Sequence, residues 1–202
     1  MILQVLEPTN PYAATKAGAE FLAKSYHRSF GMPIIITRGN NVYGPHQYPE
    51  KMIPKFINQL MRGRKVTLHG DGLNTRNFLF VEDVARAFEV ILFKGEVGKI
   101  YNIGGTNEKT NIEVASQLIK ISGHEGPVEE RMVFVEDRVF NDLRYFISCD
   151  KLHALGWVEK VSWEDGIKQT FEWYAKNSSR FGDIENALQA HPRAGLDKGV
   201  NA

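Results

Sequence analysis

Segments that favour strands alternate with segments that favour helices along this chain, and this alternation constrains the fold more than any single motif. The segment 33–39, PIIITRG, is an apolar run rich in β-branched residues, which is typical of a strand covered on both faces in a parallel sheet. A helical pattern precedes it, beginning at Asn10-Pro11 and stopping at Gly31. Further on, strands are expected within 65–72, 98–105 and 131–137, a strand followed by a helix within 76–95, and helices within 51–63, 111–123, 148–157 and 162–177. Strands that alternate with helices predict an α/β fold.

The size and charge of the chain exclude several classes of protein. With 202 residues and no evident linker or repeat, we expect one domain over 1–193 and a flexible tail over 194–202. The net charge of +1 favours neither nucleic acid nor a membrane surface as a partner. The start, MILQVLEP, does not have a signal-peptide pattern, and no apolar run is long enough to span a bilayer. The single cysteine, Cys149, allows no intrachain disulfide, which fits a cytoplasmic location.

Other candidate chemistries find little support in the sequence. The six histidines form no His-x-x-x-His pair, so no metal site is predicted, and no G-x-S-x-G motif is present. Cys149 is interpreted as a packing residue. The aromatic residues with helical spacing, which we expect in the core, are Trp163, Phe171, Trp173 and Tyr174.

Tyr12 and Lys16 lie four residues apart in the first expected helix, so their side chains share one face. An ammonium beside a phenol favours the phenolate, which can take a proton from a sugar hydroxyl. The same spacing also arises by chance in ordinary helices. The pair alone therefore does not distinguish a catalytic device from two surface residues, and the surrounding motifs must decide.

The pair opens an ordered series of motifs. PYAATK is followed by RGNNVYGP, PEKMIPKF, HGDGLNTRNFLFVEDVARA, YNIGGTNEKTN and VEDRVFNDL. This series, which extends from about Pro8 to Asn177, resembles the extended short-chain dehydrogenase/reductase superfamily and, within it, the 4,6-dehydratases of dTDP-glucose and UDP-glucose. RGNNVYGP and RVFND resemble the eukaryotic UDP-glucose enzymes more than the bacterial ones. The resemblance implies part of a Rossmann-type parallel sheet and a smaller α/β substrate-binding part.

The resemblance also implies an activity and a cofactor. Enzymes of this kind use NAD to convert a nucleotide-diphosphate glucose into its 4-keto-6-deoxy sugar, a step of deoxysugar biosynthesis such as that of rhamnose. Tyr12, assisted by Lys16, would contact NAD and remove the proton of the 4-hydroxyl while hydride passes from C4 to NAD. Water then leaves C5 and C6, and hydride returns to C6. The helix that carries the pair implies a homodimer formed through that helix.

Two motifs of such enzymes do not precede Tyr12. One is the G-x-x-G-x-x-G turn, whose backbone amides hold the NAD pyrophosphate. The other is the Thr/Ser-Asp-Glu motif that supplies the acid and base for water loss, and Glu7, without a neighbouring aspartate, does not replace it. Gly104 and Gly105 in IGGTNEKTN lack a third glycine at the required spacing. We therefore expect the C-terminal portion of such an enzyme, without the N-terminal strands of its sheet and without retained NAD.

The residues that would bind the substrate are better represented. By resemblance, Asn41 contacts the nucleotide diphosphate, and Arg76 and Arg138 clamp the pyrophosphate. Guanidinium suits this role because its planar fork makes paired bonds to phosphate oxygens. Lys51 lies at an expected helix start, where positive charge and free amides favour a phosphate. For the arginines the alternative is a surface ion pair, and for Lys51 it is a solvated helix end.

Three more positions match substrate-binding residues of the resembled enzymes. His69 would lie near the base, or it simply caps a strand. Asn111 would contact the nucleotide, or it is a plain N-cap of the helix that follows. Asn141 stands where bacterial relatives carry histidine, and Val139 replaces a usual proline, which makes the loop geometry near Arg138 less secure.

Two other functions stay open at this point. One is an epimerase or decarboxylase of the same superfamily, because these enzymes share the Tyr–Lys pair. The other is a non-catalytic protein, either a nucleotide-sugar binder or an inactive product. The PEKMIPKF and RNFLFVEDVARA motifs favour the dehydratase.

Overall fold

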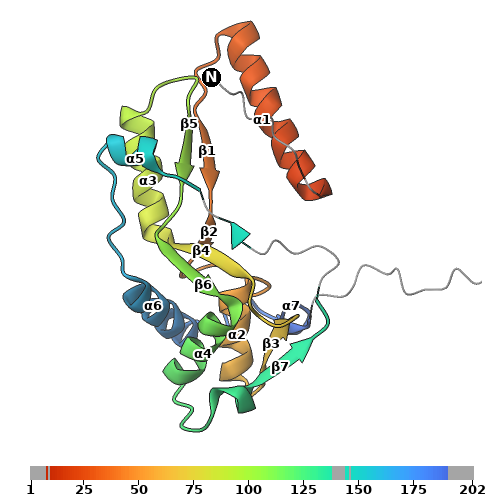
Figure 1. Cartoon of the computed structure of the whole chain (residues 1–202). Coiled ribbons are helices and arrows are strands. Elements are labelled where there is room, and N and C mark those ends of the chain that lie inside the picture. Colours follow the sequence, from red (N-terminus) through yellow and green to blue (C-terminus); the bar gives the residue numbers. More distant parts are fainter. Residues whose placement is uncertain (1–7, 9, 138–143, 146, 191–202) are drawn as a thin grey trace, which may run out of the picture.

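The computed structural model of the chain describes residue 8 and residues 10–137, 144–145 and 147–190. Helices alternate with strands, several of them in parallel pairs, which confirms the expected α/β class (Figure 1). The helices are α1 (Pro11–Phe30), α2 (Met52–Met61), α3 (Val81–Lys94), α4 (Asn111–Ile121), α5 (Asp150–Ala154), α6 (Trp163–Lys176), α7 (Glu185–Leu188) and the 3₁₀ turn η1 (Val128–Arg131). The strands are β1 (Ile36–Gly39), β2 (Asn41–Tyr43), β3 (Val66–His69), β4 (Thr75–Phe80), β5 (Ile100–Ile103), β6 (Asn107–Thr110), β7 (Met132–Val135) and β8 (Arg144–Tyr145).

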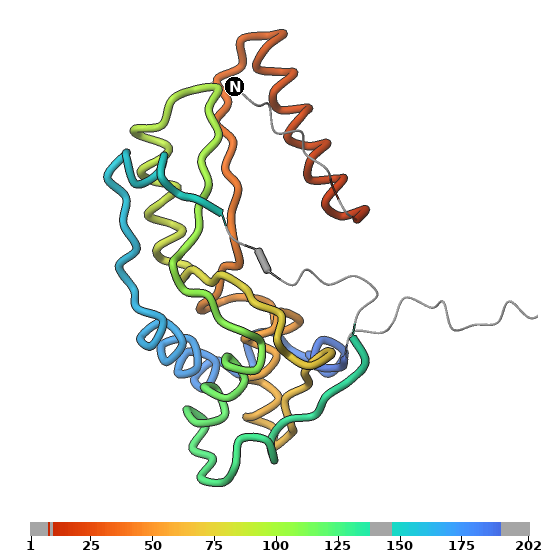
Figure 2. The backbone as a smooth tube through the Cα atoms, viewed as in Figure 1, coloured from red at the N-terminus to blue at the C-terminus, as the bar shows by residue number. Residues whose placement is uncertain are grey.

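The described strands form three small sheets. β1 and β5 make a parallel pair, and β3 and β7 make another. In the third sheet β4 is central, because β6 pairs with it antiparallel while β2 and β8 pair with it in parallel. The chain path in Figure 2 shows how β1 leads through β2 into the part of the molecule that holds the third sheet.

β1 is shorter and less covered than the apolar run 33–39 predicts. The strand begins at Ile36, and its first three residues are half-buried, so the prediction of burial on both faces is wrong for the described chain. The reason is that β1 pairs with β5 alone among the described strands, and the neighbouring helix α1 buries none of its own residues.

Helix α1 has the predicted ends. The Asn10 side chain accepts a hydrogen bond from the Ala13 backbone N–H at 2.9 Å, and Gly31 ends the helix in a left-handed conformation with φ of 66°. The helix is tied to β1 by the Glu20 carboxylate, which receives two bonds of 2.9 and 2.7 Å from the Arg38 guanidinium. These bonds hold the pKa of the Glu20 carboxyl below its ordinary value.

The core consists of two clusters of buried side chains. The larger lies among α2, α4 and α6 and includes Trp163 and Tyr174, with Phe171 and Trp173 packed at its margin, which confirms the expected aromatic core. The smaller cluster includes residues of α3, β5 and α5. None of the described helices has both the length and the apolar character that crossing a bilayer requires.

The fully buried Asp83 links α3 to the segment that leads into α6. Its carboxylate accepts hydrogen bonds from the backbone N–H groups of Lys160 and Val161 at 2.9 and 3.0 Å, and it pairs with Arg86. Trp157 donates its indole N–H to the Asp83 backbone carbonyl at 3.1 Å. These bonds join segments that are more than 70 residues apart in sequence.

Three short elements differ from the prediction or were not anticipated. NNVYGP was expected to be a loop, but 41–43 form β2 and pair with β4. The polar segment 107–110 forms β6, and 185–188 form α7 beside α2. Neither of these two segments has a hydrophobic pattern that could have predicted it. Each is stabilised instead by pairing with, or packing against, segments that are distant in the sequence.

Candidate functional site

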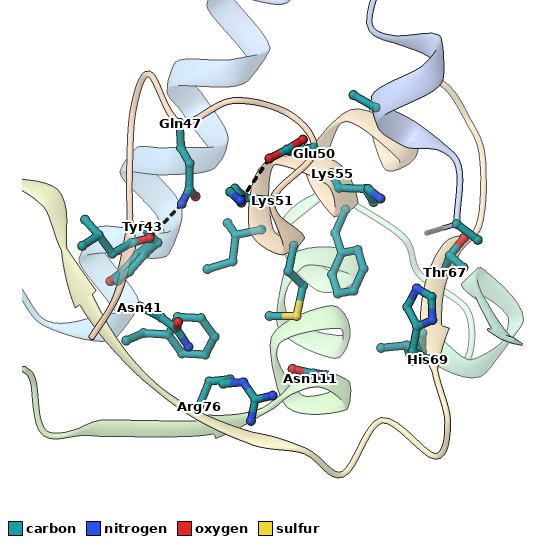
Figure 3. Close-up of a pocket in the computed structure, with 18 of the residues that line it drawn as sticks. Asn41, Tyr43, Gln47, Glu50, Lys51, Lys55, Thr67, His69, Arg76 and Asn111 are labelled. Carbon is teal, nitrogen blue, oxygen red and sulfur yellow. Dashed lines mark hydrogen bonds and ion pairs between the residues drawn. The ribbon is translucent and has the colours of Figure 1, made fainter. Parts of the chain in front are cut away.

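One cavity of about 760 Å³ collects five of the nine site residues expected from the sequence. It lies among β2, β3, β4, α2, α4 and α7 (Figure 3). The five residues that line it are Asn41, Lys51, His69, Arg76 and Asn111. They come from five separate elements, so the fold, and not local sequence, brings them together. The volume is within the range of about 300 to 1,000 Å³ that is usual for small-molecule sites.

The cationic residues of the cavity come from α2 and β4. Lys51 is the N-cap residue of α2, and its ammonium pairs with the Glu50 carboxylate at 3.0 Å. Both side chains of this ion pair are more than half exposed, so the pair is weak and Lys51 can exchange Glu50 for an anionic ligand. Arg76 lies on β4, where its guanidinium also donates to the Thr75 carbonyl at 3.0 Å.

Asn111 is not the N-cap of α4, so that alternative is wrong. Thr110 is the N-cap, and its hydroxyl oxygen accepts from the Glu113 backbone N–H at 3.2 Å. The Glu113 carboxylate accepts from the Thr110 N–H at 2.7 Å, which completes a capping box and lowers the pKa of that carboxyl. Asn111 is therefore the first helical residue, and it lines the cavity.

His69 ends β3 at the side of the cavity formed by that strand. One of its ring nitrogens, Nδ1, lies 3.2 Å from the Glu136 backbone carbonyl oxygen, which fixes the ring at the end of the β3–β7 pair. The turn that follows contains Gly70 and Gly72 with φ of 59° and 74°, as the HGDG motif predicts. Figure 3 shows His69 and Asn41 on opposite sides of the cavity.

Tyr12 and Lys16 lie on one face of α1, with the Lys16 ammonium 5.5 Å from the centroid of the Tyr12 ring. The Tyr12 side chain is exposed, and neither residue lines the cavity. The N-terminal end of α1, which carries the pair, is the end nearer to the half of the molecule that contains the cavity (Figure 1). Arg138, Asn141 and Glu7 lie outside the described residues.

A second tyrosine, Tyr43, lines the cavity but differs from Tyr12 in its environment. It is buried at the end of β2, and its ring packs against Trp163 at 5.0 Å between centroids. Burial, with a smaller contribution from nearby carboxylates, raises the pKa of the Tyr43 phenol. The phenol therefore stays protonated near neutral pH, and Tyr43 shapes the cavity without acting as a base.

The sequence matches the GDP-mannose 4,6 dehydratase family over residues 3–170, which is most of the chain. The chain belongs to this family. It is also 55% identical over 188 residues to the trifunctional UDP-glucose 4,6-dehydratase/UDP-4-keto-6-deoxy-D-glucose 3,5-epimerase/UDP-4-keto-L-rhamnose-reductase of Arabidopsis thaliana. That match covers 93% of this chain and 28% of the relative. The expected resemblance to nucleotide-sugar 4,6-dehydratases is thereby confirmed.

Solved structures with the fold of this family superpose well on the chain. The dTDP-glucose 4,6-dehydratase of Bacillus anthracis in complex with NAD is 41% identical, with a TM-score of 0.81, over 88% of this chain and 56% of that structure. The UDP-glucuronic acid 4-epimerase of Bacillus cereus in complex with UDP-glucuronic acid and NAD is 29% identical, with a TM-score of 0.79, over 85% of this chain and 55% of that structure. The chain thus spans just over half the length of these structures, which confirms a partial Rossmann-type fold.

These solved structures contain NAD, whose pyrophosphate is commonly held by the backbone amides of a glycine-rich turn. Gly105 follows β5, as such a turn would, but its backbone N–H donates to the Asn77 side chain at 3.0 Å and its carbonyl accepts from the same side chain at 2.7 Å. The following residue, Thr106, donates its N–H and hydroxyl to the Glu159 carboxylate. Because these amides are already bonded and a carboxylate lies beside them, this segment does not fit a pyrophosphate.

Sequence reasoning did not identify all of the residues that line the cavity of this family member. Lys55 of α2 is buried, and its ammonium donates to the Gln189 carbonyl at 2.8 Å. A lysine on the apolar face of MIPKFINQL was the one signal that could have revealed it. The contribution of 186–190 to the cavity had no such signal. Within the described part of the chain, no group of three or more His, Cys, Asp or Glu side chains is arranged to hold a metal ion.

Proposed function

We propose that this chain supplies the nucleotide-sugar site for NAD-dependent 4,6-dehydration of UDP-glucose or dTDP-glucose. The observation that carries the proposal is the convergence of Asn41, Lys51, Arg76 and Asn111 on one cavity. The higher identity to 4,6-dehydratases than to the 4-epimerase structure favours dehydration over 4-epimerisation.

The chemistry of these side chains suits a diphosphate. Lys51 and Arg76 bring two positive charges, and Asn41 and Asn111 bring amide donors for phosphate oxygens. Hydrogen bonds that involve a charged partner contribute about 1.5–3 kcal/mol each, which is enough to hold a diphosphate in an open site. The resemblance assigns Arg138 and Asn141 to the substrate as well, and the proposal includes them.

The residues of this chain that would act on the sugar are Tyr12 and Lys16. In this proposal Tyr12 would take the proton of the sugar 4-hydroxyl, and Lys16, whose ammonium lies 5.5 Å from the centroid of the Tyr12 ring, would assist it. NAD, when bound to the complete site, supplies the hydride acceptor. Because the segment at Gly105 and Thr106 does not fit the NAD pyrophosphate, we propose that this chain alone does not retain NAD and is inactive.

Two further properties belong to the proposal. A homodimer through α1 is supported by the apolar side chains that this helix exposes, which are Phe21, Leu22, Tyr26 and Phe30. A cytoplasmic location is supported by the single, reduced cysteine, Cys149, which is buried against Gly104 and has a raised pKa because of burial.

Calorimetric titration of the purified chain tests the proposed site. UDP-glucose and dTDP-glucose should bind with one site per chain, while glucose alone should not. Absence of binding by both nucleotide sugars would overturn the proposal. Measurement of bound NAD in the same preparation tests the second part, because a stoichiometric amount of NAD would contradict the claim that the chain does not retain it.

A non-catalytic nucleotide-sugar binder is the second candidate function, because Tyr12 and Lys16 lie outside the lining of the cavity. A turnover assay with added NAD separates the two functions. Formation of the 4-keto-6-deoxy sugar would support the enzyme, and binding without turnover would support the binder.

A further inference from the structure

Residues 184–190, here called the C-terminal wall, close one end of the cavity. Four of them line it: Asn186, Ala187, Gln189 and Ala190. The wall contains α7, which lies beside α2 although the two helices are more than 120 residues apart in sequence (Figure 2). The motifs that identify the substrate site in the sequence do not include this segment.

The wall is held in place by buried contacts. Ile184 and Leu188 are buried, with 2% and 3% of their surfaces exposed. The buried Gln59 side chain of α2 donates to the Leu188 carbonyl at 3.0 Å, and Lys55 donates to the Gln189 carbonyl. Removing the wall would leave these buried donors without their carbonyl partners, at a cost of about 1–3 kcal/mol for each donor. The wall is therefore a fixed part of the cavity.

The same contacts link the wall to β3. Gln59 also donates to the Thr67 hydroxyl at 3.2 Å and accepts from the Thr67 backbone N–H at 3.3 Å. Thr67 and His69 line the cavity next to the wall, and Asn41 lies at the opposite side (Figure 3). Arg76 and Asn111 lie between these two ends. The cavity thus has two distinct ends, with Arg76 and Asn111, two of the residues proposed to bind the diphosphate, between them.

The fold indicates which end faces the sugar and which faces the base. β1 leads directly into β2 and Asn41, and β1 carries the ion pair from Arg38 to Glu20 that holds α1. The helix with Tyr12 and Lys16 is therefore tied to the Asn41 end, where the hexose must lie if that pair acts on it. The nucleobase must then extend toward Thr67, His69 and the wall.

We infer that the C-terminal wall selects a pyrimidine base, with the side-chain amides of Asn186 and Gln189 reading its edge. This inference rests on the proposed function of the cavity. Uracil and thymine present carbonyl acceptors on either side of an N–H donor, and an amide side chain offers both a donor and an acceptor in return. A purine is one ring longer, and a wall fixed by buried contacts cannot retreat to admit it.

Binding measurements on the full chain with UDP-glucose and GDP-glucose test the inference, because these ligands differ only in the base. The unsubstituted chain should prefer UDP-glucose. Gln189→Ala and Asn186→Ala should each reduce that preference about five- to tenfold, the effect of one lost hydrogen bond. Lys168→Ala, on the exposed face of α6, is the matched control and should leave the preference unchanged.

The outcomes separate this inference from the proposed function. If neither nucleotide sugar binds the unsubstituted chain, both fail. If UDP-glucose binds but the chain does not prefer it to GDP-glucose, the wall does not select the base and the proposed function stands. The same conclusion follows if both substituted chains keep the preference and have unchanged melting temperatures. A merely structural wall would weaken binding of the two ligands equally, so an unchanged ratio with weaker binding also overturns the inference.

Discussion

The two parts of the molecule differ in how firmly they hold their candidate functional residues. The part with the cavity is built on the larger cluster of buried side chains, and its wall is joined to α2 by buried hydrogen bonds. Helix α1, in contrast, buries none of its residues and is tied to β1 by Glu20 and Arg38. The groups proposed to bind the nucleotide are thus held rigidly, and those proposed to do the chemistry are held weakly.

The largest effect is expected at Asp83, which joins α3 to the segment that leads into α6. Asp83→Ala should lower the free energy of unfolding by about 3–5 kcal/mol, as is typical when one partner of a buried, hydrogen-bonded ion pair is removed. Urea unfolding followed by tryptophan fluorescence measures the change. Glu82→Ala is the control, because Glu82 is largely exposed and lies 3.9 Å from Arg86. Equal effects of the two substitutions would show that the buried bonds of Asp83 to residues 160 and 161 do not stabilise the fold.

The second effect contrasts the cavity with α1. Arg76→Ala should weaken UDP-glucose binding about 10- to 100-fold, since it removes the proposed charge-assisted contact with the diphosphate. Lys16→Ala should leave binding within about twofold, because Lys16 does not line the cavity. Calorimetry on both variants gives the comparison, and a larger loss with Lys16→Ala than with Arg76→Ala would reverse the proposed division of roles.

The third effect concerns the attachment of α1 and depends on pH. Because the folded-state pKa of Glu20 is lowered from about 4.5, its stabilising contribution is complete above that value and is lost as the pH falls through the lowered pKa. Glu20→Gln at neutral pH should remove the same stabilising contribution. Amide hydrogen exchange in α1 should then become about fivefold faster, which corresponds to the free energy of a partly exposed ion pair.

Hydrogen exchange measured by mass spectrometry checks this prediction, with exchange rates corrected for the intrinsic effect of pH. The control is α4, whose buried face packs in the larger cluster and whose exchange should not respond to the Glu20 substitution. If α1 is equally protected in Glu20→Gln and in the unsubstituted chain, then Glu20 is not what holds the helix.

The smallest effect is expected at the surface of the C-terminal wall. Glu185→Gln removes ion pairs of 2.7 and 3.5 Å with Arg64 and Arg62, but these side chains are substantially exposed. The free energy of unfolding should fall by no more than about 1 kcal/mol, and UDP-glucose binding should not change. A larger loss of binding would mean that the exposed ion pairs, and not the buried contacts of Gln59 and Lys55, position the wall.

The sequence alone was sufficient for the elements with a strong local pattern. The helix over 11–30, with its cap and its stop, and the strand–helix unit within 76–95 are found as predicted. β2 and β6 were missed because they consist of a few polar or mixed residues that become strands by pairing with β4. The extent of β1 was overestimated because an apolar run forms a buried strand only when other strands pair with both of its edges and helices cover both of its faces.

The lining of the cavity was predicted only in part, because it includes five of the nine site residues that the motif resemblance selected, and its shape was not predicted. The motif resemblance selected Asn41, Lys51, His69, Arg76 and Asn111, and the cavity collects all five. Lys55 and the C-terminal wall were missed because their contribution depends on a contact between segments 129 and 134 residues apart. A contact between segments so far apart produces no periodic sequence pattern in either segment, so the sequence could not predict it.

The position of Arg76 within β4 has a consequence for how this site can change. Its backbone is paired with Lys109 of β6 along one edge and with Tyr145 of β8 along the other. A strand that is hydrogen-bonded along both edges can change its register only by whole residues. A shift of one residue turns every side chain to the opposite face of the sheet. The proposed recognition of a diphosphate should therefore be kept or lost as a unit, whereas the loosely attached α1 leaves the chemistry proposed for Tyr12 and Lys16 free to be adjusted in small steps.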